Sequence, residues 1–288
     1  MASSPSRSKT RHHARSISLP SRSHPLILQV NEHLCRLRSC EATCLSSSSM
    51  SSGLRGLEDW YDSIDDLLQS PQSQQTFGQE RDEKWVEEVL DGYLSLLDVC
   101  ATTKDVLAHT KQDAQELLSI LRRRRSENDF GCYLTSRKQA KKVIQKSLKG
   151  LKSIRNKNTL WALDKDPETV AIVSMLNEVE EVSLSVFESL LSYIAGTKGQ
   201  SRQSVWSLIS KLKQPKSRAS KEEETLTNEF DEVEAALKSL TGDSMNAENL
   251  QNHLVKLESV VEDLEEGLEC LFRRLIKTRV SLLNILSH

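Results

Sequence analysis

An apolar heptad stripe near the C-terminal end constrains the fold of this chain more than any other feature. Leucine and valine recur between residues 250 and 275 at alternating spacings of four and three: Leu250, Leu254, Leu257, Val261, Leu264, Leu268, Leu271 and Leu275. Such spacing keeps one narrow side of an α-helix against a neighbouring helix over many turns, whereas a β-strand alternates at every second residue. The sequence therefore predicts a long helix over about 246–286. Its partner helix lies in the same chain or in a second copy.

Similar stripes predict further helices. They cover a segment after Pro25, residues 54–68 up to Pro71, and residues 82–125, 135–157, 167–195 and 222–240. Serines at 46–49 and 51–52 predict a flexible hinge, Gly131 a turn, and Gly196 with Gly199 a helix end. The 288 residues include only 10 Gly and 6 Pro, too few for the turns of a many-stranded protein.

We therefore expect an all-α fold, an elongated antiparallel bundle with long coiled-coil-like helices and a protruding long hairpin. Residues 25–288 should form one helical domain whose core lies along the stripes 86–121, 172–193 and 250–275. Residues 1–24 contain five Lys or Arg, eight Ser and no acidic residue, which is typical of a disordered tail. The same composition occurs in organelle transit peptides, but the apolar positions that follow Pro25 at once favour a lead into the fold.

Charge is strongly segregated along the chain although the formal net charge is only −2. Residues 122–157 hold 13 Lys or Arg against two acids, which gives +11, and residues 222–269 hold 15 Asp or Glu against two Lys, which gives −13. Each run is most simply the solvated face of a helix. The alternatives are that the two runs attract each other inside the fold, or that they bind external charged partners.

Candidate contacts to an anionic surface lie in two basic segments, 122–157 and 202–218. We single out Arg122, Arg123, Arg124, Arg125, Lys138, Lys141, Lys142 and Trp206. Residues 201–221 contain no acid. We predict a short basic amphipathic helix and linker there, with apolar positions at Val205, Trp206, Leu208, Ile209 and Leu212. That helix suits an anionic membrane or a helix-binding groove, although burial in the bundle explains it more simply. Nucleic acid is a less favoured partner, because Tyr133 is the only aromatic residue from 132 to 157 and base stacking needs more.

The tail contains a candidate phosphorylation site. Arg15 lies three residues before Ser18 and Pro20 lies two residues after it. Phosphoserine readers of the 14-3-3 type recognise this arrangement, because an arginine cluster binds the phosphate and proline directs the chain out of the groove. We therefore predict phosphorylation of Ser18 and a possible reader of that type as partner.

Nothing in the sequence predicts an enzyme, a cofactor or a metal site. Glycine-rich phosphate-binding loops and the His-Glu-x-x-His spacing are absent, and His109 is expected on a solvated helix face. Six cysteines without a Cys-x-x-Cys pair favour free thiols in a reducing compartment. Zinc binding at Cys40 and Cys44 is the less favoured alternative to burial as small apolar groups.

The chain also resembles a known family. The residues that carry the resemblance are Arg15 to Pro25, Leu37 to Glu41, Gly56 to Tyr61, Asp66 to Leu68, Lys84 to Val86, Asp91-Gly92, Leu96 to Cys100, Gln115 to Leu117, Leu121 to Arg124 and Ser136 to Lys138. In this order they are similar to the BYPASS-related plant proteins of unknown function. The resemblance implies a plant-specific helical protein associated with root and shoot development, and it implies no catalytic residues.

We therefore expect a non-enzymatic regulatory or protein-interaction protein. The alternative is a peripheral binder of an anionic membrane or nucleic acid. We expect a cytoplasmic location, with the membrane periphery or the nucleus as alternatives and plastid or mitochondrial import less favoured. The oligomeric state is left open, because heptads specify a partner helix without specifying its chain.

Overall fold

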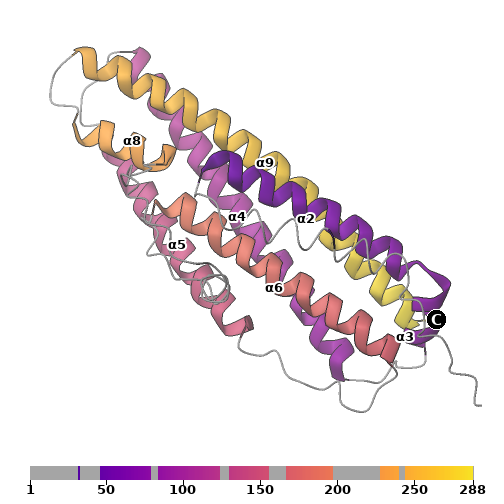
Figure 1. The fold of residues 1–288 in the computed structure, drawn as a ribbon. Coiled ribbons are helices and arrows are strands. Elements are labelled where there is room, and N and C mark those ends of the chain that lie inside the picture. The colour runs from indigo at the N-terminus through magenta and orange to yellow at the C-terminus, as the bar shows by residue number, and fades with distance from the viewer. Residues whose placement is uncertain are drawn as a thin grey trace, which may run out of the picture.

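The computed structural model describes residues 32, 46–78, 84–123, 130–155, 167–196, 228–239 and 244–287. Within these ranges the chain forms α-helices and no β-strand, which confirms the all-α class (Figure 1). The helices are α2 (Ser47–Leu68), α3 (Pro71–Gly78), α4 (Lys84–Arg122), α5 (Gly131–Arg155), α6 (Pro167–Ala195), α8 (Glu229–Lys238) and α9 (Ser244–Ser287). In the part of the chain described, no helix is long and apolar enough to cross a membrane.

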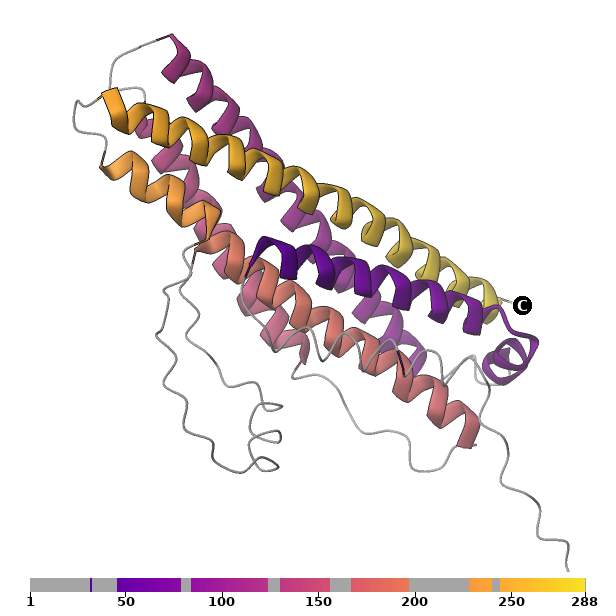
Figure 2. The ribbon, with the colours of Figure 1, turned by 45° about the horizontal axis from the view of Figure 1, so that its top comes forward.

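The two longest helices, α4 and α9, run side by side along the length of the molecule (Figures 1 and 2). Lys111 Nζ lies 3.0 Å from Glu262 Oε1, and Lys104 forms an ion pair with Glu269. The second pair lies seven residues earlier in α4 and seven later in α9, so the helices are antiparallel and in heptad register. All eight residues of the 250–275 stripe are fully buried, which confirms that its partner helices lie within the chain.

Helices α8 and α2 flank α9 one after the other. On α8, Glu232 Oε2 accepts a hydrogen bond from Lys256 Nζ at 3.2 Å. On α2, Asp62 Oδ1 lies 2.8 Å from Arg274 Nη1. The N-terminal turns of the two helices meet where Ser47 Oγ donates to Glu229 Oε1 at 3.3 Å. Helices α8 and α2 therefore follow one another along α9.

The serine run was expected to be a flexible hinge, and that expectation is wrong. Ser47 to Ser52 form the first turns of α2, and Ser46 is its N-cap, with Oγ accepting from the Ser49 amide at 3.2 Å. A serine side chain satisfies one of the unpaired amides at a helix start, so a run that reads as a linker can nucleate a helix. Burial of Met50 then holds the first turn against the bundle.

Helix α6 runs through the centre of the bundle, in contact with α2, α4 and α5. Its stripe Ile172, Leu176, Val179, Val186, Leu190 and Tyr193 is buried, as predicted. Gly196 follows the helix with φ of 66°. A Cβ atom there would lie 1.9 Å from Asp231 Oδ1, so both the backbone angle and the close approach of α8 require glycine.

Three boundaries differ from the predicted ones. Helix α5 begins at Gly131, where a turn was expected, and Tyr133 in its first turn is buried. Helix α3, which begins at Pro71, was not predicted, although proline fits the first turn of a helix. Within the predicted range 222–240, the described helix is α8 with Asn228 as its N-cap.

Candidate interaction surface on helix α5

Helix α5 carries eight Lys or Arg and no acidic residue, and it divides them between two faces. Tyr133, Ile144 and Leu151 form its buried side, and Arg137 lies among them with only 3% of its surface exposed. A helix turns 100° per residue, so residues three and four apart share a face. Of the remaining cations, Lys141 and Arg155 lie near this inner side and pair with Glu234 and Glu188. The other five follow the outer side of the helix.

Five exposed lysines form a continuous line on this outer side. Lys138, Lys142, Lys146, Lys149 and Lys152, here called the lysine row, are spaced by four, four, three and three residues. This spacing keeps them within an arc of about 120° and spreads them over about 21 Å of helix. No ion pair among the described residues involves these five ammonium groups, so their charge faces outward.

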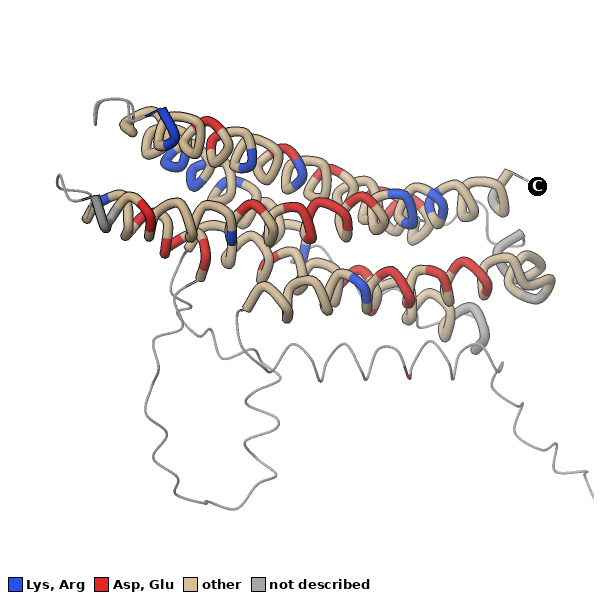
Figure 3. Tube along the Cα trace, turned by 90° about the horizontal axis from the view of Figure 1, so that it is seen from above, with Lys and Arg blue, Asp and Glu red and all other residues tan. Residues whose placement is uncertain are grey.

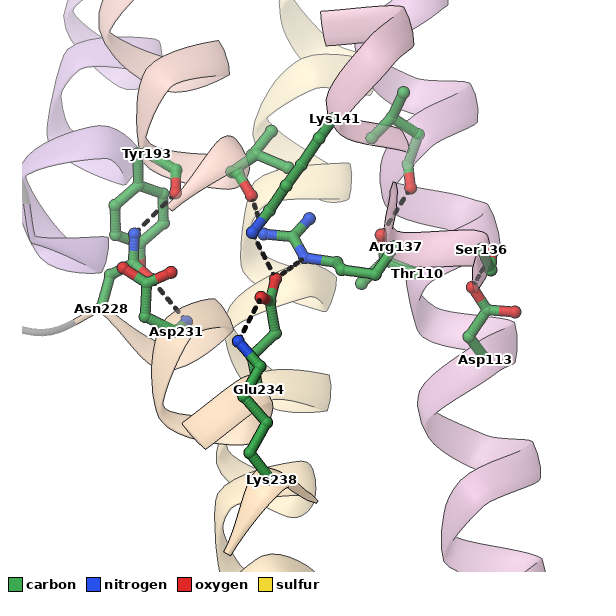
Figure 4. Close-up of polar contacts among 12 residues, drawn as sticks. Thr110, Asp113, Ser136, Arg137, Lys141, Tyr193, Asn228, Asp231, Glu234 and Lys238 are labelled. Atoms are coloured by element: carbon green, nitrogen blue, oxygen red, sulfur yellow. Dashed lines mark hydrogen bonds and ion pairs between the residues drawn. The ribbon is translucent and has the colours of Figure 1, made fainter. Parts of the chain in front are cut away.

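The inward cations of α5 bind α8 and α6 instead (Figure 4). Arg137 Nε donates to Glu234 Oε1 at 3.0 Å, and Arg137 Nη2 donates to the carbonyl of Ile194. Lys141 Nζ lies 2.6 Å from the same Glu234 oxygen. The guanidinium of Arg137 also lies 4.8 Å from the centre of the Phe230 ring, a cation–π contact.

This junction stabilises Glu234 in its charged form. Burial alone would raise the pKa of the Glu234 carboxyl, but the hydrogen bonds and positive charges of Lys141 and Arg137 outweigh burial and lower it. The carboxylate therefore stays ionised while it holds α8 against α5. The two oppositely charged segments of the sequence do attract each other inside the fold at this point, although the lysine row does not take part.

The N-terminal end of α8 is fixed by polar contacts to α6, which Figure 4 also shows. Asn228 Nδ2 donates to the Tyr193 carbonyl at 2.7 Å, while Asn228 Oδ1 accepts from the Asp231 amide at 2.9 Å. The Tyr193 hydroxyl donates to Glu229. One asparagine thus caps α8 and ties it to the end of α6, which orients Glu234 toward α5.

The predicted contact residues do not all lie on one surface. Lys138 and Lys142 belong to the lysine row, whereas Lys141 binds Glu234. Arg122 and Arg123 lie exposed at the C-terminal end of α4. The other residues that the sequence singled out lie outside the described residues: Ser18, Arg15, Pro20, Arg124, Arg125, Trp206, Cys40 and Cys44.

Sequence reasoning did not single out Lys146, Lys149 and Lys152 of the row, nor Arg137 and Glu234 of the junction. The spacing of the lysines opposite Ile144 and Leu151 could have identified the row. Nothing in the sequence identified Glu234 as the partner of Arg137, because the two are 97 residues apart.

A shallow hollow lies between α4 and α9 and is lined by charged residues. Lys104, Lys111, Glu262, Glu265 and Glu269 contribute to its walls. Lys111 pairs with both Glu262 and Glu265, and Lys104 pairs with Glu269. Asp105 and Glu266 also line the hollow, so five acids face two lysines and the hollow keeps a net negative charge. The ion pairs of the two lysines hold α4 against α9.

Comparison with known proteins gives one match. A family model described as Protein BPS1 matches residues 53–285, from the second turn of α2 almost to the end of α9. No curated protein and no solved structure matches the chain.

Proposed function

Because the chain belongs to the BPS1 family, we propose that it is a non-enzymatic regulator of plant development that acts by binding other proteins. The lysine row of α5 is the observation that supports this proposal best. The resemblance of the sequence to the BYPASS-related proteins implies an association with root and shoot development. The row offers a surface through which such a protein would recognise an acidic partner.

The contrast between the two faces of α5 supports a binding role for the row. Arg137 and Lys141, on or near the inner side, are matched by Glu234, whereas the five outer lysines have no acid on their own helix. Five like charges within about 21 Å repel one another, and an acidic segment of another protein would relieve that repulsion. The row runs along α5 and therefore matches an acidic helix or an extended acidic chain laid along this helix.

Peripheral binding to an anionic membrane is the second candidate, and it is favoured by the same row. Each lysine near an anionic bilayer contributes about 1 kcal/mol of attraction. The exposed apolar residue Val143 lies to one side of the row, so it cannot insert while the lysines face the bilayer. Nucleic acid is a weaker candidate, because Tyr133 is buried and cannot stack on a base.

Charge reversal in the row tests the proposal. We expect Lys142→Glu, Lys146→Glu and Lys149→Glu together to remove partners recovered from plant roots and to abolish rescue of a developmental mutant. A matched variant with Arg55→Glu, Arg122→Glu and Arg123→Glu, three exposed cations outside the row, has the same net charge and should retain both. If both variants lose the partners and the rescue equally, the lysine row is not the binding surface.

Vesicles with and without phosphatidylserine and a single-stranded RNA distinguish the second candidate. If the protein binds the vesicles or the RNA at about 50 mM salt, loses this binding by about 200 mM and needs the lysine row for it, the row would be a site for an anionic surface. Row-dependent recovery of proteins without such binding would favour the protein partner.

A further inference from the structure

Four large apolar side chains are exposed where the first half of α4 pairs with the second half of α9. Leu94 is 46% exposed, Ile276 42%, Val280 47% and Leu283 39%. Leu90, Leu97 and Phe272 beside them are half-buried against the core. We call these seven residues the apolar patch.

The heptad register of α4 and α9 explains why the patch forms there. The ion pairs Lys111–Glu262 and Lys104–Glu269 lie one heptad apart on the rim of the helix pair. One further heptad in the same direction places Leu97 opposite Ile276, and the next places Leu90 opposite Leu283. The same rim positions therefore change from ion pairs to aliphatic side chains along the pair.

In the patch, the positions beside the α4–α9 contact are apolar on both helices. The apolar surface is therefore wider than the two helices can bury against each other. Helices with such widened apolar sides pack against additional helices. The patch is therefore a site that another helical surface would cover.

The patch lies between two helix segments of opposite charge. Residues 85–103 of α4 include Glu87, Glu88, Asp91 and Asp98 and no Lys or Arg. Residues 270–287 of α9 include Arg273, Arg274, Lys277 and Arg279 and no acid. Within the chain Arg273 pairs with Glu269, Arg274 with Asp62 and Lys277 with Asp65, although the side chains of Arg273 and Lys277 remain more than half exposed. Figure 3 shows the cations of α9 gathered toward the end marked C and acidic residues along the part before it. A partner for the patch should accordingly carry a basic and an acidic side.

We propose that a second copy of this chain covers the apolar patch, related to the first by a twofold axis parallel to α4 and α9. This rotation places the basic end of α9 in each copy over the acidic half of α4 in the other, with the apolar side chains between them. The register brings Arg273 of one copy within one turn of the level of Asp98 in the other. A twofold axis across the helices would instead set α4 against α4 and bring like charges together.

The interface is self-complementary, as a twofold dimer requires. From Phe272 to Leu283 the patch runs about 17 Å, and two helices of about 10 Å width give roughly 350 Å² on each copy. Tight complexes bury about 800 Å² per partner, so we expect a dimer that dissociates in the micromolar range. This inference is independent of the lysine row, which lies on α5.

Analytical ultracentrifugation of the full chain between about 1 and 100 μM tests the dimer, a range set around the expected micromolar dissociation constant. We expect Val280→Glu to weaken dimerisation at least tenfold. The matched control is Val255→Glu, which is on the same helix and 50% exposed but lies outside the patch, and it should leave dimerisation unchanged. Circular dichroism checks that both variants stay folded.

Charge exchange tests the orientation of the copies and does not depend on the apolar variant. Asp98→Lys and Arg273→Glu should each weaken the dimer, and the chain that carries both should regain it, because each lysine then faces a glutamate of the other copy. A chain that is monomeric at all concentrations overturns the proposal. So does a dimer that Val280→Glu leaves intact, or single charge variants that the double variant fails to rescue.

Discussion

The carboxylate of Glu180 in α6 lies against Gly92 in α4, and a Cβ atom at Gly92 would be 2.5 Å from Glu180 Oε2. The two helices approach closely at this point because glycine leaves room for the acid. Glu180 is only 5% exposed, and burial raises its pKa from 4.5 to about 7. Tyr61 and Tyr93 lie nearby with their rings edge to face, 6.1 Å apart. An ionisable group thus lies in the contact between α2, α4 and α6.

The raised pKa of Glu180 predicts that the protein loses stability as pH rises from about 5 to 8. Between the unfolded pKa near 4.5 and the folded pKa near 7, the folded state binds the extra proton, so the free energy of unfolding falls with pH. Above that range the penalty is complete, on the order of 3 kcal/mol. Glu180→Gln should remove this part of the pH dependence. Urea unfolding of both proteins at several pH values measures it, and parallel pH profiles would contradict the prediction.

Gly92→Ala should destabilise the protein by about 1–3 kcal/mol, although alanine is the better helix former by about 1 kcal/mol. The added methyl group would displace the Glu180 carboxylate. In a chain that also carries Glu180→Ala the same change should be neutral or stabilising. A double-mutant cycle measures this coupling, and additive effects would show that the two residues do not compete for space.

Arg137→Met should cost about 3–5 kcal/mol, because it breaks a buried ion pair, leaves the Ile194 carbonyl without its donor and loosens α8. Lys141→Met is the matched control: it removes a partner of the same carboxylate from a more exposed position and should cost about 1 kcal/mol or less. Thermal unfolding of the two variants compares them. Equal losses of stability in the two variants would show that Arg137 contributes no more to the junction than Lys141 does.

Leu264→Ala should cost about 2–5 kcal/mol, because Leu264 is completely buried in the stripe that pairs α9 with its neighbours. Val255→Ala, on an exposed side of the same helix, should cost less than about 0.5 kcal/mol. Chemical denaturation gives both values. A loss below about 0.5 kcal/mol for Leu264→Ala would mean that the stripe contributes little to the core.

Phosphorylation of Ser18 stays a prediction, because Ser18 and Arg15 lie outside the described residues. We expect Ser18→Ala to change cellular location or partner recovery and to leave the melting temperature unchanged, since loss of one serine hydroxyl removes no apolar side chain. Phosphopeptide mapping of protein from plant tissue that covers residues 15–25 under several conditions and finds Ser18 unmodified would exclude it.

The long helices could be predicted because their apolar residues repeat over many turns. The predicted bounds 82–125 and 246–286 lie within three residues of α4 and α9. Each stripe also identified the buried side, since packing of one apolar face decides where a helix lies. The serine run failed as a prediction because the same side chains that favour loops also cap helices. Contacts of the folded chain distinguish the two outcomes, namely burial of Met50 and the hydrogen bond from Ser47 to Glu229.

The candidate surface was predictable only in part. A run of lysines identifies a basic helix, but the sequence does not say which cations face inward. The buried position of Arg137 depends on Glu234, which arrives from a distant helix. The contact of Glu180 with Gly92 was unpredictable for the same reason. Neither residue is part of a periodic pattern, and the two meet only once α4 and α6 are packed.

The order of the helices also has a consequence for biosynthesis. Helix α9 packs against α2, α4 and α8, yet it leaves the ribosome after all of them. Translation proceeds at about 5–20 residues per second, so the 121 residues between Arg122 and Ser244 delay α9 by roughly 6–24 s after α4 is complete. During that interval the apolar sides of α2 and α4 lack the helix that buries them. The core is therefore completed only after α9 has been synthesised, and a chain that ends before residue 244 lacks the helix that closes it.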